Sequence, residues 1–356
     1  MAADWLAIVE AAYAAAPTDA AWLEGVARAA RPLIDRGGGV HGYFVDMHSS
    51  ACPLRQPLLV GGPPEWRRAW RGTWWEPLMA SMSLAHVRLV HSLTSVCYTT
   101  DLFAAVADDA PSYDAYLSRV ATRHWGAARV LRGARPVGDI GLFPDSFNVA
   151  CIDGEGHGCV LVANMPDPSK RPVATRLARS WAKVAAHIAA GHRLRRKRKS
   201  ADALEAAEAI FDTAGRAVHA EGPASERWAL DAIREVATSI DRARTRIERR
   251  DPARALEAWR ALALGRWTIL DCFDRDGRRY IVAQPNEPSP RAGPALTRRQ
   301  AQIVASVALG HSNKLIAYEL GLSASTVSSH VAAAARRLGA RTRVDLVLRA
   351  RQNDPA

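Results

Sequence analysis

The sequence predicts a multidomain α+β protein, in which a region of mixed helices and strands precedes an all-α domain of four helices. Three observations support this prediction. Apolar residues recur at helical spacing over 296–347 and are interrupted by single glycines, as in short packed helices. Strand–turn–strand patterns occur over 146–163 and twice within 200–290. A proline-rich run at 285–294 separates the two kinds of sequence.

The chain begins with two amphipathic helices and a strand. Tryptophan and aliphatic residues at helical spacing predict helices over 4–15 and 19–30. Three glycines, 37–39, then precede a strand over 40–47. Further helices are expected from Pro63 onward, over 76–90 and over 112–125. The first of these carries one stripe of tryptophans, which favours core packing over the wall of a ligand pocket: Trp66, Trp70 and Trp74.

A hairpin and a long helix follow. Strands are expected over 146–152 and 158–163, joined by a turn at 153–156. The two arms carry Cys151 and Cys159, which are either buried small side chains or a redox pair. The next helix, 173–192, has an apolar stripe that approximates a heptad seam and so predicts pairing between two copies: Val173, Leu177, Trp181, Val184 and Ile188. The basic run 192–199 is expected to be a solvated helix end or linker.

This order of elements resembles the GAF or PAS class of ligand-sensing domains, in which strands form the sensor and a terminal helix leads to an output domain. We therefore expect a GAF-like domain over 1–195. In the segment 196–284, two Phe-Asp-x-x-Gly phrases predict two hairpins, and helical sequence lies between them, over about 225–262. The segment resembles a degenerate PAS-like relay module; the alternative is a helical spacer that carries two hairpins. Residues 285–295 are expected to be a proline-rich linker.

The C-terminal region has the pattern of a helix-turn-helix. Thr297, Ser312 and Ser323 are good N-caps for three successive helices. Glycines 310, 321 and 339 follow the expected helix ends. The second and third helices are joined by a tight glycine turn, and in this motif the second helix of the pair enters the major groove of DNA.

The same residues resemble the C-terminal LuxR-type (NarL/FixJ-like) domain of bacterial transcription regulators. The matching landmarks are Leu296, Thr297, Arg299, Gly310, Ser312, Asn313, Lys314, Ile316, Ala317, Leu320, Ser323, Thr326, Val327, His330, Leu338, Gly339 and Arg343. The resemblance implies a four-helix domain over 296–356, with a fourth helix at about 342–351. It also implies a dimer that binds a (pseudo)palindromic operator in double-stranded DNA, and RNA polymerase as a candidate partner.

The expected DNA contacts fall into two groups. Contacts with phosphate are expected from Lys314, Arg336, Arg337, Thr297 and Asn313. Contacts in the recognition helix are expected from Ser325, Thr326, Val327, Ser328, Ser329 and His330. The chain departs from the family pattern at Gln300 and Leu315, where Glu is frequent, and at Ser328, where Lys is common. These departures leave open the alternative that the domain is an interaction module that has lost DNA binding.

Charge and composition favour a polyanionic partner. The formal net charge is +12, and residues 291–356 hold ten basic and three acidic side chains, a net charge of +7. No apolar run is long enough to span a membrane, and the N-terminus has no basic region of the kind that begins a signal peptide. Five scattered cysteines without a CxxC pair indicate reduced thiols. We therefore expect a cytoplasmic protein.

The sequence thus predicts a DNA-binding transcription regulator under the control of an N-terminal sensor, acting as a homodimer. Neither a nucleophile elbow nor a paired-carboxylate site is present, so we expect no enzyme and no cofactor. The histidines lack the spacing of metal ligands, so we expect no metal. The alternatives are a thiol redox switch based on Cys151 and Cys159, and a ligand-sensing interaction protein with a degenerate DNA-binding domain. The signal that is sensed is not specified by the sequence.

Overall fold

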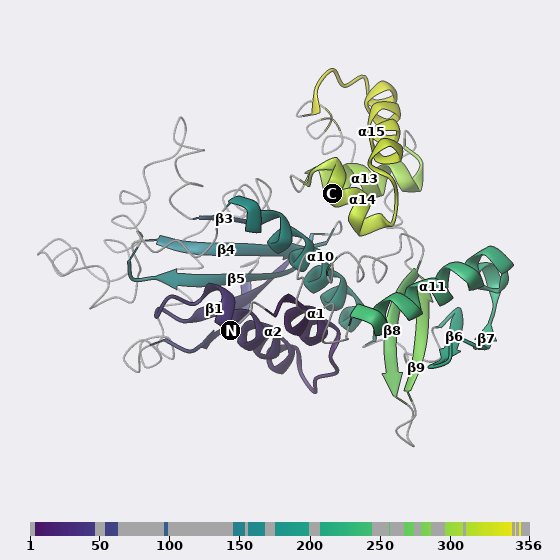
Figure 1. Ribbon diagram of the computed structural model, residues 1–356. Coiled ribbons are helices and arrows are strands. Elements are labelled where there is room, and N and C mark those ends of the chain that lie inside the picture. The colour runs from purple at the N-terminus through teal and green to yellow at the C-terminus, as the bar shows by residue number, and fades with distance from the viewer. Residues whose placement is uncertain are drawn as a thin grey trace, which may run out of the picture. The chain divides into compact units, whose positions relative to one another are not determined.

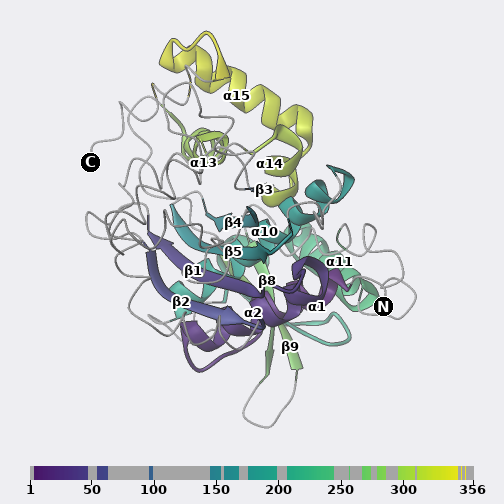
Figure 2. The ribbon, with the colours of Figure 1, turned by 90° about the vertical axis from the view of Figure 1, so that its left-hand side faces the viewer.

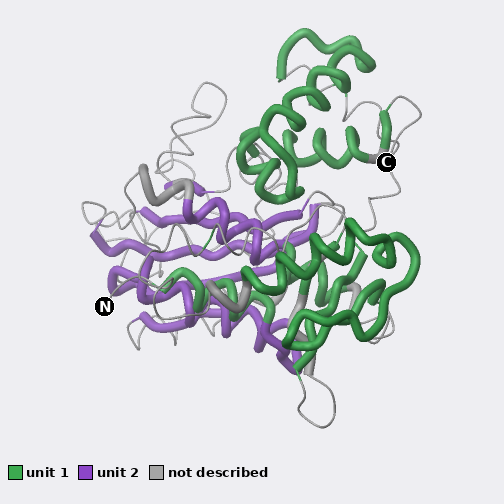
Figure 3. The backbone as a smooth tube through the Cα atoms, turned by 45° about the vertical axis from the view of Figure 1, so that its right-hand side comes forward, with its two compact units in different colours: residues 1–13, 190–356 green, residues 14–189 purple. Residues whose placement is uncertain are grey.

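A computed structural model describes most of the N-terminal and C-terminal regions and parts of the middle of the chain (Figure 1). The described residues are 4–46, 54–62, 96–98, 145–153, 156–167, 175–198, 207–243, 256, 267–273, 279–285, 296–308, 311–343, 346 and 349. The chain divides into two compact units (Figure 3). One consists of residues 14–189, and the other combines residues 1–13 with residues 190–356.

The unit of residues 14–189 is built on a five-stranded antiparallel sheet (Figure 2). Its strands lie in the order β2-β1-β5-β4-β3. They are β1 Val40–Asp46, β2 Leu54–Val60, β3 Val96–Tyr98, β4 Asp145–Ile152 and β5 His157–Met165. The β4–β5 hairpin confirms the predicted strands, and its turn closes as Gly156 adopts a φ of 77°.

Two helices cover one face of this sheet. In α2, Asp19–Ile34, the ring of Trp22 stacks on Phe44 of β1 with the ring centroids 6.2 Å apart. In α10, Thr175–Arg198, Trp181 meets Phe147 of β4 edge to face at 5.9 Å. Strand register puts Phe44 and Phe147 on the same side, because their partners on β5 are Cys159 and Ala163, four residues apart.

The predicted seam on α10 is wrong as a route to pairing between two copies. Trp181, Val184 and Ile188 are all buried within a single chain, at 1%, 0% and 0% exposure. A stripe of apolar residues every three or four positions has the same spacing whether it packs on another helix or on a sheet. The sequence therefore identified the buried side of α10 correctly but not what covers it.

The second unit begins with α1, Trp5–Tyr13, which lies against α10. Gly191 of α10 allows this close approach, since a Cβ atom there would lie 2.2 Å from the carbonyl oxygen of Ala12. The basic run was expected to be a solvated helix end or a linker. It is a helix end, because α10 continues through it to Arg198, but His192 and Leu194 are buried. Only part of the run therefore faces solvent, because a helix always turns some of its residues inward.

The two predicted hairpins of the middle segment are confirmed, and they form one sheet. The strands are β6 Ala209–Asp212, β7 Ala217–Ala220, β8 Trp267–Phe273 and β9 Arg279–Pro285, in the order β7-β6-β9-β8. The short helix η2, Gly222–Ser225, leads into α11, Arg227–Ala243. The ring centroid of Trp228 on α11 lies 5.7 Å from that of Trp267 on β8. Because β6 pairs directly with β9, this segment is better described as one small α+β module than as a spacer with two separate hairpins.

The described part of the second unit also contains α13 Arg298–Ala308, α14 Asn313–Leu320 and α15 Ala324–Leu338. They confirm the three predicted C-terminal helices. The predicted helices from Pro63 onward, over 76–90 and over 112–125, and the linker from 286 to 295 lie outside the described residues. In the part of the chain that is described, no helix is long and apolar enough to cross a membrane.

Two glycine-to-alanine substitutions test the packing of the first unit. A Cβ atom at Gly158 would lie 2.0 Å from the carbonyl oxygen of Cys151, so Gly158→Ala should force β4 and β5 apart and cost about 1–3 kcal/mol. Gly25 lies inside α2 with no atom within 4 Å of such a Cβ, so Gly25→Ala should stabilise by about 0.5–1 kcal/mol. Urea denaturation followed by tryptophan fluorescence measures both. Equal shifts of the two midpoints would contradict the described hairpin.

Candidate nucleic-acid interface

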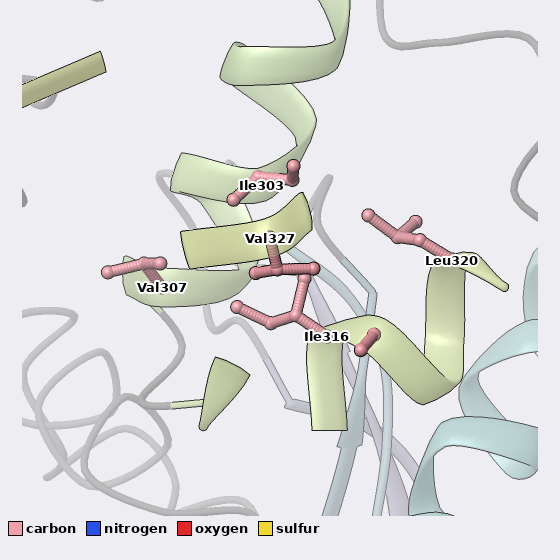
Figure 4. Packing of buried hydrophobic residues seen from close by; sticks show 6 residues of the cluster. Ile303, Val307, Ile316, Leu320 and Val327 are labelled. Carbon is pink, nitrogen blue, oxygen red and sulfur yellow. The ribbon is translucent and has the colours of Figure 1, made fainter. Parts of the chain in front are cut away.

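The C-terminal domain is held together by a small apolar core between its three described helices. Side chains of α13, α14 and α15 meet in one cluster (Figure 4). It consists of Ile303, Val307, Ile316, Ala317, Leu320 and Val327. A second cluster, Val304, Ala334, Leu338 and Leu346, joins α13 to the far half of α15 and to a helical position in the predicted fourth helix. Together the clusters fix which side of α15 faces outward.

Serine caps and glycine turns set the ends of the helices. The hydroxyls of Ser312 and Ser323 accept hydrogen bonds from the N–H groups of Leu315 and Thr326, 3.2 and 3.0 Å away. Gly321 ends α14 in the left-handed region, with a φ of 61°, and Gly339 ends α15 in the same way. The short turn at Gly321 produces the helix-turn-helix predicted from the sequence.

The N-terminal half of α15 presents a surface of small hydroxyl side chains. Ser325, Thr326, Ser328 and Ser329 are exposed, and His330 is half-buried. Val327 is fully buried in the apolar core, so the prediction that its side chain faces DNA does not hold in this structure. A helix that packs on two others must turn at least one residue per turn inward, and here that residue is Val327.

Each hydroxyl of this surface already has a partner within the chain. The Ser323 hydroxyl lies 2.7 Å from that of Ser325 and 2.8 Å from that of Thr326. Ser328 and Ser329 donate to the carbonyl oxygens of Ala324 and Ser325, at 2.9 and 3.1 Å. Hydroxyl donors bound to their own helix must exchange that partner to bind a base edge, so hydrogen bonds to bases should add little net affinity here.

The residues expected to contact phosphate differ in their exposure and in the hydrogen bonds that they make within the chain. Lys314 and Arg336 are exposed. Arg337 donates to the Gln300 side-chain oxygen, 2.9 Å away, and that oxygen also accepts from the Thr297 N–H at 3.0 Å. The Thr297 hydroxyl caps the Gln300 N–H at 3.2 Å, so Thr297 and Gln300 form a reciprocal capping box at the start of α13. Gln300 thus replaces the family's frequent Glu without loss of the cap.

Sequence reasoning missed a buried ion pair between the segment that precedes α14 and the C-terminal end of that helix. His311 Nδ1 lies 2.9 Å from a Glu319 carboxylate oxygen, and both side chains are largely buried. Burial by itself would lower the pKa of His311, but the negative charge and hydrogen bond of Glu319 outweigh it and raise the pKa above its ordinary value. The two residues are eight positions apart, a spacing that carries no recognisable signal in sequence.

Within the described part of the chain, a pair of thiols is a further candidate for chemistry. Cys151 and Cys159 are direct cross-strand partners on β4 and β5, both buried and both free thiols. Burial raises the pKa of Cys151, and its hydrogen bond with Cys159 raises it further. The described residues include no group of side chains able to hold a metal ion. The tryptophan stripe at 66–74 lies outside them.

Comparison with known proteins points to the same C-terminal domain. The family model described as bacterial regulatory proteins, luxR family, matches residues 294–350. The HTH-type transcriptional activator RamA of Corynebacterium glutamicum is 44% identical over 57 residues, which are 16% of this chain and 20% of that protein. The glycerol metabolism activator of Pseudomonas putida is 40% identical over 62 residues, 17% of this chain and 28% of that protein. The chain thus spans 20–28% of the length of these relatives.

The raised pKa of His311 predicts a dependence of stability on pH. A histidine whose pKa is higher in the folded state binds its proton more tightly there. Its contribution is therefore complete below the unfolded-state pKa, and it is lost as pH rises through the folded-state pKa. An NMR titration of the histidine ring protons in the full chain, with His311→Gln to assign the resonance, should give a midpoint above about 6.5. Glu319→Gln should lower that midpoint, and an unchanged value would contradict the ion pair.

Proposed function

We infer that residues 294–350, a LuxR-type helix-turn-helix domain, bind double-stranded DNA, and we propose that the whole chain is a transcription regulator that acts through them. The observation that carries this proposal is the exposed N-terminal half of α15, the second helix of the motif. Its outward residues are small, so α15 can approach the floor of a major groove closely.

The charge around this helix supports binding to a phosphate backbone. Lys314 at the start of α14 and Arg336 near the end of α15 are both exposed cations. The net charge of +7 over 291–356 adds a sequence-independent attraction. Since the hydroxyls of α15 are bound within the chain, we propose that phosphate contacts supply most of the affinity and that base contacts adjust it.

We further propose that the N-terminal region controls this domain as a sensor. Two features support this proposal: the antiparallel sheet with α2 on one face, and the long α10 that follows the sheet in sequence. Within the second unit, the Tyr318 hydroxyl on α14 donates to the carbonyl oxygen of Leu256 at 2.9 Å. This bond supports a relay role for the segment 196–284. The protein would bind a (pseudo)palindromic operator as a homodimer and act on RNA polymerase.

The pairing surface of that dimer is not the stripe on α10. Trp181 is buried against Phe147, so Trp181→Glu would disrupt the first unit rather than report on association. A helix-turn-helix dimer requires its two recognition helices to lie about one turn of DNA apart, roughly 34 Å. We propose that DNA itself brings two copies to this spacing.

A second candidate function is a thiol redox switch, favoured by the direct pairing of Cys151 with Cys159. Oxidation by a peroxide would convert two thiols to one disulfide, with the peroxide reduced to water and an alcohol or to two waters. Thiol titration of the unfolded chain, before and after reductant, discriminates. Two additional thiols after reduction would support the switch, and five thiols in both samples would favour two buried small side chains.

The proposed function predicts enrichment of DNA sites. Purified full-length protein, incubated with a fragmented genomic library, should retain fragments that share one roughly palindromic site. Retention of fragments without a shared site would indicate phosphate binding alone. Failure to retain any fragment would contradict DNA binding by the full chain under the conditions used.

The phosphate contacts predict a measurable dependence on salt. Lys314→Ala should weaken binding to all DNA sequences alike and reduce the slope of log K against log salt by about 0.9. Arg216→Ala is the matched control, because it removes an exposed cation from the β6–β7 hairpin and should leave the slope unchanged. Equal effects of the two substitutions would contradict a contact at Lys314.

A further inference from the structure

A chain of hydrogen bonds connects the recognition helix to the rest of the C-terminal domain. Ser328 on α15 uses its hydroxyl twice, since it donates to the Ala324 carbonyl and accepts from the Asn313 side-chain amide, each at 2.9 Å. Asn313 in turn accepts from Arg343 through its side-chain oxygen, at 2.8 Å. One hydrogen bond from each partner fixes the rotamer and the flip of the Asn313 amide.

Arg343 donates two of the hydrogen bonds in this network, to two different partners. One of its terminal nitrogens binds Asn313, and the other donates to the backbone carbonyl of His311. His311 is itself held by Glu319 from the far end of α14. The planar guanidinium therefore bridges a side chain and a backbone group that are two residues apart, which a single ammonium group cannot do in the same geometry.

Ser328 makes this arrangement possible. The family commonly has Lys at this position, and a lysine ammonium has three donors and no acceptor, so it cannot receive the Asn313 amide. Serine is short and can both donate and accept. The departure at Ser328 and the hydrogen bond from Asn313 therefore belong together, because a short side chain that can accept stands where the family commonly has a long cation.

We propose that Arg343 is a positioning residue for DNA recognition, and that it holds Asn313 and Ser328 as a single contacting unit. The inference rests on the proposed DNA binding. Asn313 has two amide N–H groups, and Ser328 takes one of them. The second N–H is the donor that the unit offers to a base oxygen of the DNA, and not to the phosphate that the sequence led us to expect for Asn313. Arg343 acts through the orientation of that donor and does not neutralise a phosphate itself.

Arg343→Lys tests positioning separately from charge. The affinity of the full chain is measured for its enriched site and for a scrambled site at several salt concentrations. Arg343→Lys and Arg343→Ala should both lower the ratio of the two affinities about tenfold, with the salt slope unchanged. Arg349→Lys is the matched control, because Arg349 also donates to a backbone carbonyl, that of Leu338, and should leave the ratio unchanged. A slope reduced by about one in Arg343→Ala alone would overturn the proposal in favour of a phosphate contact.

A double-mutant cycle tests whether Asn313 and Ser328 act together. Asn313→Ala and Ser328→Ala should each lower the affinity ratio, and the double variant should be no worse than Asn313→Ala, because the second change removes a partner already lost. If the double variant lowered the affinity ratio by the product of the two single losses, Asn313 and Ser328 would act independently and the single unit would be overturned. If the unmodified protein bound neither site, the proposed function itself would fail. If the unmodified protein bound its enriched site and the variants kept the same affinity ratio, only the role of Arg343, Asn313 and Ser328 would fail. Thermal unfolding followed by circular dichroism identifies any variant that fails to fold.

Discussion

The burial of Val327 is the constraint on which the candidate interface depends. Its side chain lies in the apolar cluster shared with α13 and α14, close to Ile303 and Ile316 (Figure 4). Because α15 is a regular helix, one inward residue sets the direction of all the others. Ser325, Thr326, Ser328 and Ser329 consequently face outward. The apolar core thereby determines which residues could meet DNA, although none of the core residues would touch it.

The surface so defined is unusual in having few strong donors of its own. Charged groups lie at its borders, whereas its centre consists of hydroxyls that already bind the chain. Such a surface can fit closely into a groove, but it gives little discrimination through bidentate hydrogen bonds. The rigidity supplied by Arg343, Asn313 and the Ser323 hydroxyl would then matter more than the chemistry of any one side chain, since preorganised groups lose less entropy on binding.

The sequence predicted local features well and tertiary partners less well. The serine caps, the glycine turns and the β4–β5 hairpin each depend on residues a few positions apart, so their signals are local. The partner of the α10 stripe could not be predicted, because helical spacing does not tell a sheet from a second helix. The prediction that Val327 faces DNA was wrong because the family motif identifies the helix but not which side of it packs inward. The ion pair between His311 and Glu319 joins residues eight positions apart, a spacing that does not predict contact from sequence.

The most direct test of the central account is hydrogen–deuterium exchange of the full chain, with and without DNA that carries its enriched site. The account predicts that DNA slows exchange in peptides that cover the start of α14 and the N-terminal half of α15, with little change over β1 to β5. Protection confined to other basic segments, such as the helical run at 192–198, would contradict it. In that case the chain would bind DNA by charge and not through the helix-turn-helix.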